Sequence, residues 1–223
     1  LGQDPVTWVV SSSKLNRAKA DELEVVSAIR GRPLPVVKSE TNDFLVPAQA
    51  EMVIEGEITL ADLEREGPYG EGLGYQGDGE MAWWMDVTTV THRRSPWLHN
   101  SFTGVDRGPI KSPGVASSYL FAKKFVPEIA DFHYLSNANN IFFISIDKSA
   151  PGQGLAAGEK LGKFNPVAKV VIVLDKDVDL MDMAQVMAAI SSRWQPSPAA
   201  RIFDNLPGLP LDPSQKDPNK TSK

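Results

Sequence analysis

The spacing of hydrophobic residues predicts two short elements in the first thirty residues. The segment VTWVV, residues 6–10, is largely β-branched and aromatic, which predicts a short strand. A helix is predicted for residues 20–30, because apolar side chains recur on one face at Leu23, Val26 and Ile29. Gly31 follows directly and suits the left-handed position at which many helices end.

The middle third of the chain alternates between apolar and polar residues and predicts strands. Three segments show this pattern and are rich in Val, Ile, Thr and Trp: PVVKSE (35–40), LVPAQAEMVIEGEI (45–58) and MAWWMDVTTVTHRR (81–94). Glycine-rich turns separate them, which favours an antiparallel sheet or barrel. Trp83 and Trp84 are expected to point to opposite faces of one strand.

After about residue 112 the pattern changes to alternating helices and buried strands. A helix is predicted from Val115 to Ile129, with an interruption near Pro127. The segment NNIFFISIDK (139–148) predicts a buried strand, and GQGLAAGEKLG (152–162) predicts a short helix.

The segment VAKVVIVLDKDVD (167–179) predicts a strand that leads into a further helix. Asp179 would cap this helix and Pro196 would follow its end. Its apolar face would carry Leu180, Met183, Val186, Met187, Ile190 and Trp194. Strand, helix, strand and helix in this order predict an α/β layer. The chain is therefore expected to be α+β, with a β-rich part at residues 1–110 and an α/β domain at residues 111–223.

Composition and charge narrow the classes of function. The formal charge of −5 argues against nucleic acid as a main partner. No apolar run approaches the roughly 20 residues that span a bilayer, and a cytoplasmic location is expected. There is no cysteine, which excludes disulfides and thiolate chemistry. The three histidines, His92, His99 and His133, form no HExxH or HxH pair, so a histidine-built zinc site is not expected.

The acidic run DKDVDLMD (175–182) invites comparison with a calcium-binding loop. An EF-hand loop needs Gly at its sixth position and Glu at its twelfth, where this chain has Leu180 and Val186. The run is therefore interpreted as a strand end that leads into the first turn of a helix.

Glu66 and Glu71 stand five residues apart in the segment EGPYGEGLGY (66–75). Pro68 sets a turn, and the glycines permit positive φ or a close approach of another group, namely Gly67, Gly70, Gly72 and Gly74. Such a loop can hold two carboxyl groups near one point, where one stays protonated at neutral pH and can donate a proton. The alternative is a tight hairpin with incidental charges, and the spacing alone leaves both open.

With its surroundings, this loop resembles the UbiD-type decarboxylase family, whose signature is E-G-P-[FY]-G-E. Further segments match in order, namely DELEVVSAIRGRPLPVVKSET (21–41), TTVTHRRSP (88–96), VVIVLDKDVDLMDMAQVMAAISSRW (170–194) and LPGLPLDPS (206–214). The resemblance covers essentially the whole chain. It implies an antiparallel split β-barrel of the flavin-reductase type, followed by an α/β C-terminal domain.

The resemblance also implies a carboxy-lyase that uses prenylated FMN to decarboxylate, or carboxylate, an aromatic or α,β-unsaturated acid without oxidation. In that family a glutamic acid protonates the carbon that CO₂ leaves. Carried onto this sequence, Glu71 is the proton donor, and Glu66 is the partner carboxylate that pairs with an arginine. Gly72, directly after the acid, implies a wide pocket that suits a larger or bicyclic aromatic acid.

Cofactor and metal contacts are likewise implied by the resemblance. Glu22 matches a glutamate that helps to bind a divalent metal at the flavin phosphate, and Mn²⁺ or Mg²⁺ suits a carboxylate with phosphate oxygens. K⁺ is a further candidate ion. Ser12 and Ser13 lie at the phosphate contact of the family, and Lys163 lies near a lysine that neutralises the phosphate. From the residues alone, both serines would be polar loop residues and Lys163 a solvated charge.

Members of the family are longer, and an N-terminal domain carries the metal-binding Asn and His, the catalytic Arg and much of the flavin pocket. The expected partners are therefore an N-terminal flavin-binding domain or subunit and further copies of the chain. The chain is interpreted as a fragment, one polypeptide of a split enzyme, or a truncated homologue, and is not expected to decarboxylate alone. The alternative function is a non-catalytic flavin-binding or assembly subunit.

Overall fold

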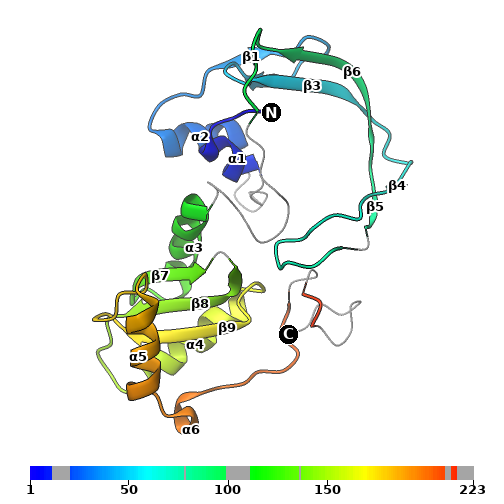
Figure 1. The fold of residues 1–223 in the computed structure, drawn as a ribbon. Helices are drawn as coiled ribbons and strands as arrows, with labels where there is room; N and C mark the ends of the chain where they lie inside the picture. The colour runs from blue at the N-terminus through cyan, green and yellow to red at the C-terminus, as the bar shows by residue number, and fades with distance from the viewer. Residues whose placement is uncertain (12–20, 78, 99–110, 136, 209–211, 215–223) are drawn as a thin grey trace. The chain divides into compact units, whose positions relative to one another are not determined.

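The computed structural model describes residues 1–11, 21–77, 79–98, 111–135, 137–208 and 212–214 (Figure 1). The chain divides into two compact units. One comprises Leu1–Tyr69, Gln76–Thr103 and Arg107–Pro113, and the other comprises Gly70–Tyr75, Gly104–Asp106 and Gly114–Lys223. None of the helices in the described part of the chain has the length and apolar character that a bilayer crossing requires.

The first unit begins with helix α1 (Pro5–Ser11), so the strand predicted for residues 6–10 is wrong. The carboxylate of Asp4 accepts hydrogen bonds from the backbone N–H groups of Val6 and Thr7, at 3.1 and 3.2 Å. Pro5 occupies the first helical position, where its missing N–H costs nothing. This cap outweighs the strand preference of the β-branched residues that follow.

Helix α2 (Glu22–Arg30) confirms the second predicted element. Asp21 caps its start, accepting the Leu23 N–H at 2.7 Å, and Gly31 ends it in the left-handed conformation with φ of 65°. The two helices meet in a small core of Val10, Val26 and Leu34, and Arg30 reaches the carboxylate of Asp4 at 3.1 Å.

Strands of the first unit pair as three antiparallel two-stranded ribbons in the described residues, which confirms the predicted antiparallel pairing. The pairs are β1 (Val36–Lys38) with β2 (Leu45–Pro47), β3 (Met52–Ile58) with β6 (Met85–His92), and β4 (Glu64–Arg65) with β5 (Met81–Ala82). Trp83 and Trp84 lie in the connection between β5 and β6, so their predicted placement on one strand is wrong.

One face of the β3–β6 ribbon is apolar and exposed. Ile54 lies opposite Val90, and Ile58 opposite Met85, and a register shift after Glu55 brings Val87 onto the same face. Five apolar side chains of this face are 38 to 55% exposed: Ile54, Ile58, Met85, Val87 and Val90. We call these five residues the ribbon face.

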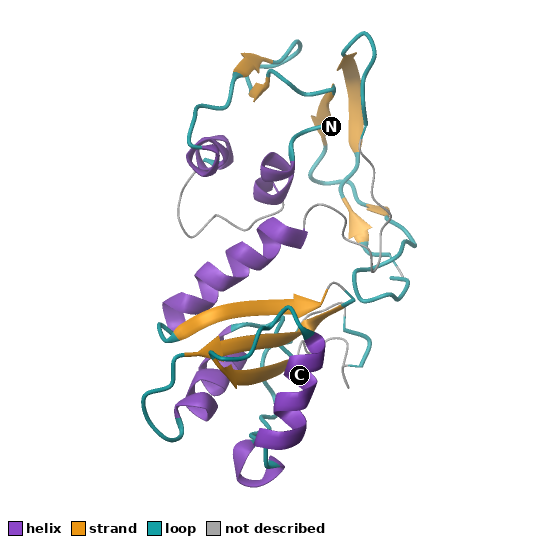
Figure 2. Cartoon of the chain, turned by 60° about the vertical axis from the view of Figure 1, so that its left-hand side comes forward, coloured by secondary structure: helices purple, strands orange, loops and turns teal. Residues whose placement is uncertain are grey.

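The second unit is an α/β layer, as predicted, and it is built on a three-stranded sheet. Its strands are β7 (Ile129–Leu135), β8 (Ala138–Ile146) and β9 (Val170–Asp175), with β7 and β8 antiparallel and β8 and β9 parallel. Its helices are α3 (Lys111–Phe125), α4 (Gln153–Phe164), α5 (Met183–Arg193) and the short α6 (Pro196–Ala199). Figure 2 shows helices on both sides of this sheet, and each side has its own buried core.

Three details of the second unit differ from the prediction. Helix α3 ends at Phe125, and the chain starts strand β7 at Ile129, a strand that the hydrophobic pattern did not reveal. Asp182 caps α5, because its carboxylate accepts the Ala184 N–H at 2.9 Å, so the cap predicted at Asp179 is wrong. Of the predicted apolar face, Leu180 and Val186 are fully buried, whereas Met187 and Trp194 are 60 and 45% exposed.

Candidate functional site

The loop that carries Glu66 is closed by backbone hydrogen bonds at its base. The Glu66 N–H donates to the Glu80 carbonyl at 2.8 Å, and the Gly77 N–H donates to the Tyr69 carbonyl at 3.0 Å. Gly79 has a φ of +78°, and a Cβ at this position would lie 1.8 Å from the Glu66 carbonyl oxygen. Only glycine therefore lets the chain pass against the backbone of Glu66.

Glu71 lies in a tight turn of its own. Its N–H donates to the Tyr75 carbonyl at 2.8 Å, and its carbonyl accepts the Gly74 N–H at 2.9 Å. Glu71 is half-buried, whereas Glu66 is exposed. The Gly70–Tyr75 turn belongs to the second unit and Glu66 to the first, so each carboxylate is positioned by a different unit. The pairing of the two carboxylates stays a prediction.

Two of the four glycines singled out in this loop have the expected backbone conformation. Gly67 and Gly74 have φ of 86° and 85°. Gly79 was missed by the sequence reasoning, although the glycine pair that precedes β5, Gly77 and Gly79, was a signal that could have found it.

Glu22, the predicted metal ligand, is exposed in the first turn of α2. An exposed carboxylate fits a hard divalent cation as one oxygen ligand. No group of three His, Cys, Asp or Glu residues in the described ranges could hold a metal ion. The role of Glu22 as a metal ligand therefore stays a prediction.

The residues predicted to contact the cofactor phosphate are placed only in part. Ser12 and Ser13 lie outside the described residues. Lys163, in the last turn of α4, lies 2.6 Å from the Glu159 carboxylate, and its ammonium lies 4.9 Å from the centre of the Phe203 ring. Lys163 belongs to the second unit and Glu22 to the first.

The carboxylates of the acidic run at residues 175–182 form hydrogen bonds and ion pairs within the chain, which agrees with the predicted structural role of this run. Arg193 donates to both carboxylate oxygens of Asp177, at 3.0 and 2.8 Å. Lys148 lies 3.0 Å from Asp175, and Asp179 accepts the Met181 N–H at 2.9 Å.

Glu55, on strand β3, is a buried carboxylate that the sequence reasoning did not single out. It accepts hydrogen bonds from the Glu40 and Thr41 N–H groups, both at 2.9 Å, and from the Thr41 hydroxyl at 2.5 Å. The hydrogen bond from Thr41 is the main reason that the pKa of Glu55 lies below its ordinary value, against the opposing effect of burial.

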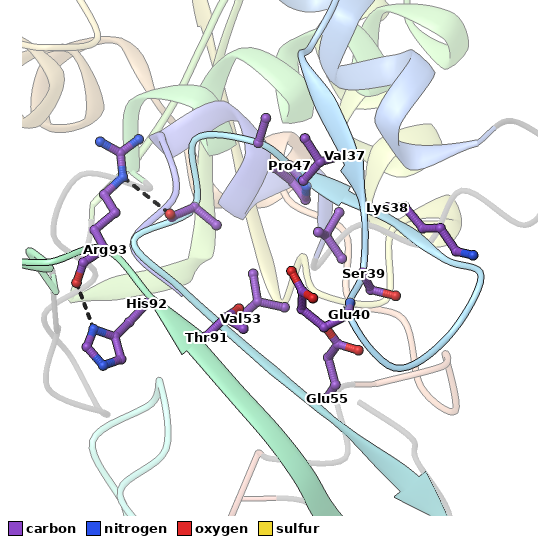
Figure 3. Close-up of a pocket in the computed structure, with 13 residues that line it drawn as sticks. Val37, Lys38, Ser39, Glu40, Pro47, Val53, Glu55, Thr91, His92 and Arg93 are labelled. Carbon is purple, nitrogen blue, oxygen red and sulfur yellow. Dashed lines mark hydrogen bonds between the residues drawn. The ribbon is translucent and has the colours of Figure 1, made fainter.

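Glu55 lines a hollow of about 210 Å³ between the β1–β2 and β3–β6 ribbons (Figure 3). His92 also lines this hollow; its Nδ1–H donates to the Arg93 carbonyl at 2.7 Å, and its side chain is exposed. The guanidinium of Arg93 donates to the Gln49 carbonyl at 3.2 Å.

Comparison with known proteins identifies the family of this chain. The C-terminal domain of 3-octaprenyl-4-hydroxybenzoate carboxy-lyase matches residues 111–223, and the Rift-related domain of the same enzyme matches residues 1–106. The chain belongs to the UbiD family. It is 29% identical to a phenolic acid decarboxylase of Sedimentibacter hydroxybenzoicus, over all of this chain and 48% of that protein.

Solved structures of UbiD-class enzymes share the fold. HmfF from Pelotomaculum thermopropionicum, in complex with FMN, is 31% identical with a TM-score of 0.82, over 98% of this chain and 50% of that one. The vanillic acid decarboxylase of S. hydroxybenzoicus in open form is 29% identical with a TM-score of 0.84, over 98% and 48%. An evolved dimeric form of HmfF with prFMN is 32% identical with a TM-score of 0.76, over 89% and 47%.

These likenesses confirm the α+β fold predicted from the sequence. The chain spans about half the length of the relatives it matches.

Proposed function

We propose that this chain forms the Rift-related and C-terminal parts of a prenylated-FMN-dependent decarboxylase that acts reversibly on an aromatic or α,β-unsaturated carboxylic acid. The match of both UbiD-family domains along the chain carries this proposal. The relatives named as phenolic acid and vanillic acid decarboxylases support an aromatic acid as substrate.

Glu71 is proposed as the proton donor. Prenylated FMN supplies, when bound, an electron-accepting ring that takes up the electron pair of the bond to the departing CO₂. Glu71 then protonates the substrate carbon that CO₂ has left, and takes a proton from solvent for the next turnover. Its half-buried position in a turn with fixed backbone hydrogen bonds supports this role, because a donor must be held at one place relative to the substrate. Glu66 is the proposed partner carboxylate, held by the closed base of its loop.

Cofactor binding by this chain is proposed to use four residues. Glu22 would supply one carboxylate ligand to Mn²⁺ or Mg²⁺, and Ser12 and Ser13 would contact the phosphate. Lys163 would neutralise phosphate charge, which requires it to leave the exposed ion pair with Glu159. Such an exposed pair contributes at most about 1 kcal/mol, so exchanging Glu159 for a phosphate is a small step.

The partner is proposed to be a flavin-binding domain or subunit that covers the ribbon face. A two-stranded ribbon is marginally stable in water by itself, and a second layer of apolar side chains would stabilise it. The relatives contain about as much chain again as the part matched here, which is enough for such a domain. Mass measurement of the native material tests this point, since a co-purifying or covalently continuous flavin domain is expected.

The alternative proposal, a flavin-binding or assembly subunit without chemistry, accounts for the fold but not for the carboxylates of the EGPYGE loop. The two proposals are separated by assembling the complete protein with prenylated FMN and Mn²⁺ and offering a panel of aromatic acids. CO₂ release that depends on the cofactor supports the decarboxylase. The subunit would be supported instead if the cofactor binds but no acid releases CO₂ and no decarboxylated product exchanges hydrogen with solvent at the carbon that had carried the carboxyl group.

A further inference from the structure

Leu1 pairs with strand β3 through its backbone. The Leu1 amino group donates to the Met52 carbonyl at 2.8 Å, and the Leu1 carbonyl accepts the N–H groups of Glu51 and Met52, at 3.1 and 3.3 Å. Figure 1 marks this end of the chain beside the β3–β6 ribbon. Two residues that exchange both hydrogen bonds in this way form an antiparallel pair of a sheet. Leu1 therefore holds one position of a third strand next to β3.

Gly2 turns the chain away from this edge of β3. Its φ of +66° suits glycine, and a Cβ at this position would lie 2.4 Å from the Glu51 Cβ. Helix α1 then starts at Pro5. The residues from Gly2 onward therefore do not continue the pairing that Leu1 makes with β3.

The backbone groups of β3 alternate between its two edges. The Glu51 carbonyl accepts the N–H of Arg93, the residue directly after β6, at 3.0 Å, whereas the next carbonyl, that of Met52, faces Leu1. By the same alternation, the N–H and carbonyl of Ile54 point to the Leu1 side. Among the described residues, β6 is the only strand paired with β3, so no strand covers Ile54 on that side.

This outer edge of β3 has the properties of a strand-binding edge. Outward N–H and carbonyl groups at the edge of a sheet are a template for pairing, and proteins that prevent such pairing often place proline or lysine there. The sequence of β3, MVIEGEI, contains neither residue. The register shift after Glu55 limits the regular part of the edge to residues 52–55.

We propose that the outer edge of β3 binds an extended strand of the flavin-binding domain, antiparallel to β3 and in line with Leu1. This inference rests on the partner proposed above and deepens it, because the partner would join the ribbon through main-chain hydrogen bonds as well as cover its apolar face. The strand residue opposite Ile54 would place its side chain on the ribbon face, so an apolar residue is expected at that position. A third strand would also stabilise the two-stranded ribbon.

Amide exchange in the complete protein tests the strand. In a sample labelled with ¹⁵N-isoleucine, the Ile54 amide is expected to exchange at least about tenfold more slowly than the Ile202 amide, after correction for the neighbouring residues. Ile202 is the reference because it lies outside the helices and strands and its side chain is 91% exposed. Equally fast exchange at Ile54 and Ile202 would overturn the proposal.

Engineered disulfides identify the strand that pairs with β3. The chain has no cysteine, so Ile54→Cys is combined with single cysteines placed along the flavin-binding domain of the complete protein. A disulfide is expected at one position of an extended segment and not at the two positions next to it, whose side chains point to the other face. Val170→Cys, at an exposed strand position of the second unit, is the control and should form none.

The two measurements separate the strand from the partner itself. A disulfide between Ile54→Cys residues of two copies of this chain would overturn the proposal, since the edge would then bind a second copy. Fast exchange at Ile54 in a protein whose ribbon face still binds the flavin-binding domain would overturn the strand and leave the proposed partner in place. Absence of any flavin-binding domain from the native protein would contradict both.

Discussion

At the scale of single residues, Glu55 is the clearest case of a side chain whose role comes from its surroundings. In the sequence, Glu55 stands on a predicted strand of alternating polar and apolar residues, and this pattern does not distinguish it from the neighbouring surface glutamates. The structure buries it and gives its two oxygens four donors from the Glu40–Asn42 turn. Sequence periodicity identifies the strand, but it does not reveal that a turn 13 to 15 residues earlier folds back onto the Glu55 carboxylate.

The lowered pKa of Glu55 makes a prediction about acid stability. A carboxylate with a folded-state pKa below its ordinary value of 4.5 stabilises the fold above that value and loses this contribution as the pH falls through the folded pKa. Glu55→Gln is therefore expected to lower the free energy of unfolding at neutral pH and to weaken its dependence on acid. Urea unfolding at a series of pH values measures this, with Glu57→Gln, an exposed neighbour, as the control. An unchanged pH dependence in Glu55→Gln would contradict the assignment.

Gly79 makes a prediction about the candidate site. Alanine here would meet the Glu66 carbonyl oxygen and would adopt a positive φ, so Gly79→Ala should cost roughly 1–3 kcal/mol and displace Glu66. Gly31→Ala is the control that separates the cost of positive φ from the cost of the clash. Gly31 has a φ of +65°, but nothing lies within 4 Å of the added Cβ. Thermal unfolding of both variants should show the larger loss for Gly79→Ala. Equal losses would mean that the approach to Glu66 is unimportant.

At the scale of elements, capping and pairing decide where the hydrophobic pattern misleads. Helices α2 and α4 and the strands of the middle third follow from spacing, because their apolar residues mark one face. Helix α1 does not follow from the spacing of apolar residues. Asp4 and Pro5 start this helix, although its β-branched residues favour a strand. Strand β7 was missed because the predicted helix ran to Ile129 and the residues after it were left unassigned; its pairing with β8 makes it a strand.

The cap of α1 gives a prediction at this scale. Asp4→Ala removes the hydrogen bonds to Val6 and Thr7 and should destabilise the protein by about 0.5–2 kcal/mol. Asp4→Asn keeps a capping oxygen but loses the charge that faces Arg30, so it should cost less. The free energy of unfolding of the three proteins checks the order. Equal losses in the two variants would show that the ion pair, which both remove, and not the cap, holds α1.

At the scale of the whole molecule, the ribbon face is the proposed contact with a flavin-binding domain. If a flavin-binding domain covers it, a charge placed there must be buried on assembly at considerable cost. Val87→Lys is expected to lower the affinity for that domain at least tenfold, measured by co-purification or calorimetry. Val170→Lys, at a comparably exposed strand position of the second unit, should leave the affinity unchanged. Equal affinity for Val87→Lys and the wild type would exclude the ribbon face as the contact.

The candidate site was only partly predictable from the sequence. The glycine and proline residues of the EGPYGE loop predict its turns, and the resemblance to the UbiD family assigns roles to Glu66 and Glu71. Their placement in two different compact units is a property of tertiary contacts that no local pattern encodes. For the same reason the engagement of Lys163 with Glu159 and Phe203 could not be read from spacing alone.

The most direct test of the account is proton exchange catalysed by Glu71. In the complete protein with prenylated FMN and Mn²⁺, the decarboxylated product is incubated in D₂O, and deuterium at the carbon that CO₂ leaves is measured by NMR. Glu71→Gln is expected to slow this exchange by about 10²–10⁴-fold while the flavin spectrum is retained, and Glu64→Gln should exchange at the wild-type rate. Wild-type exchange in Glu71→Gln would contradict the central claim.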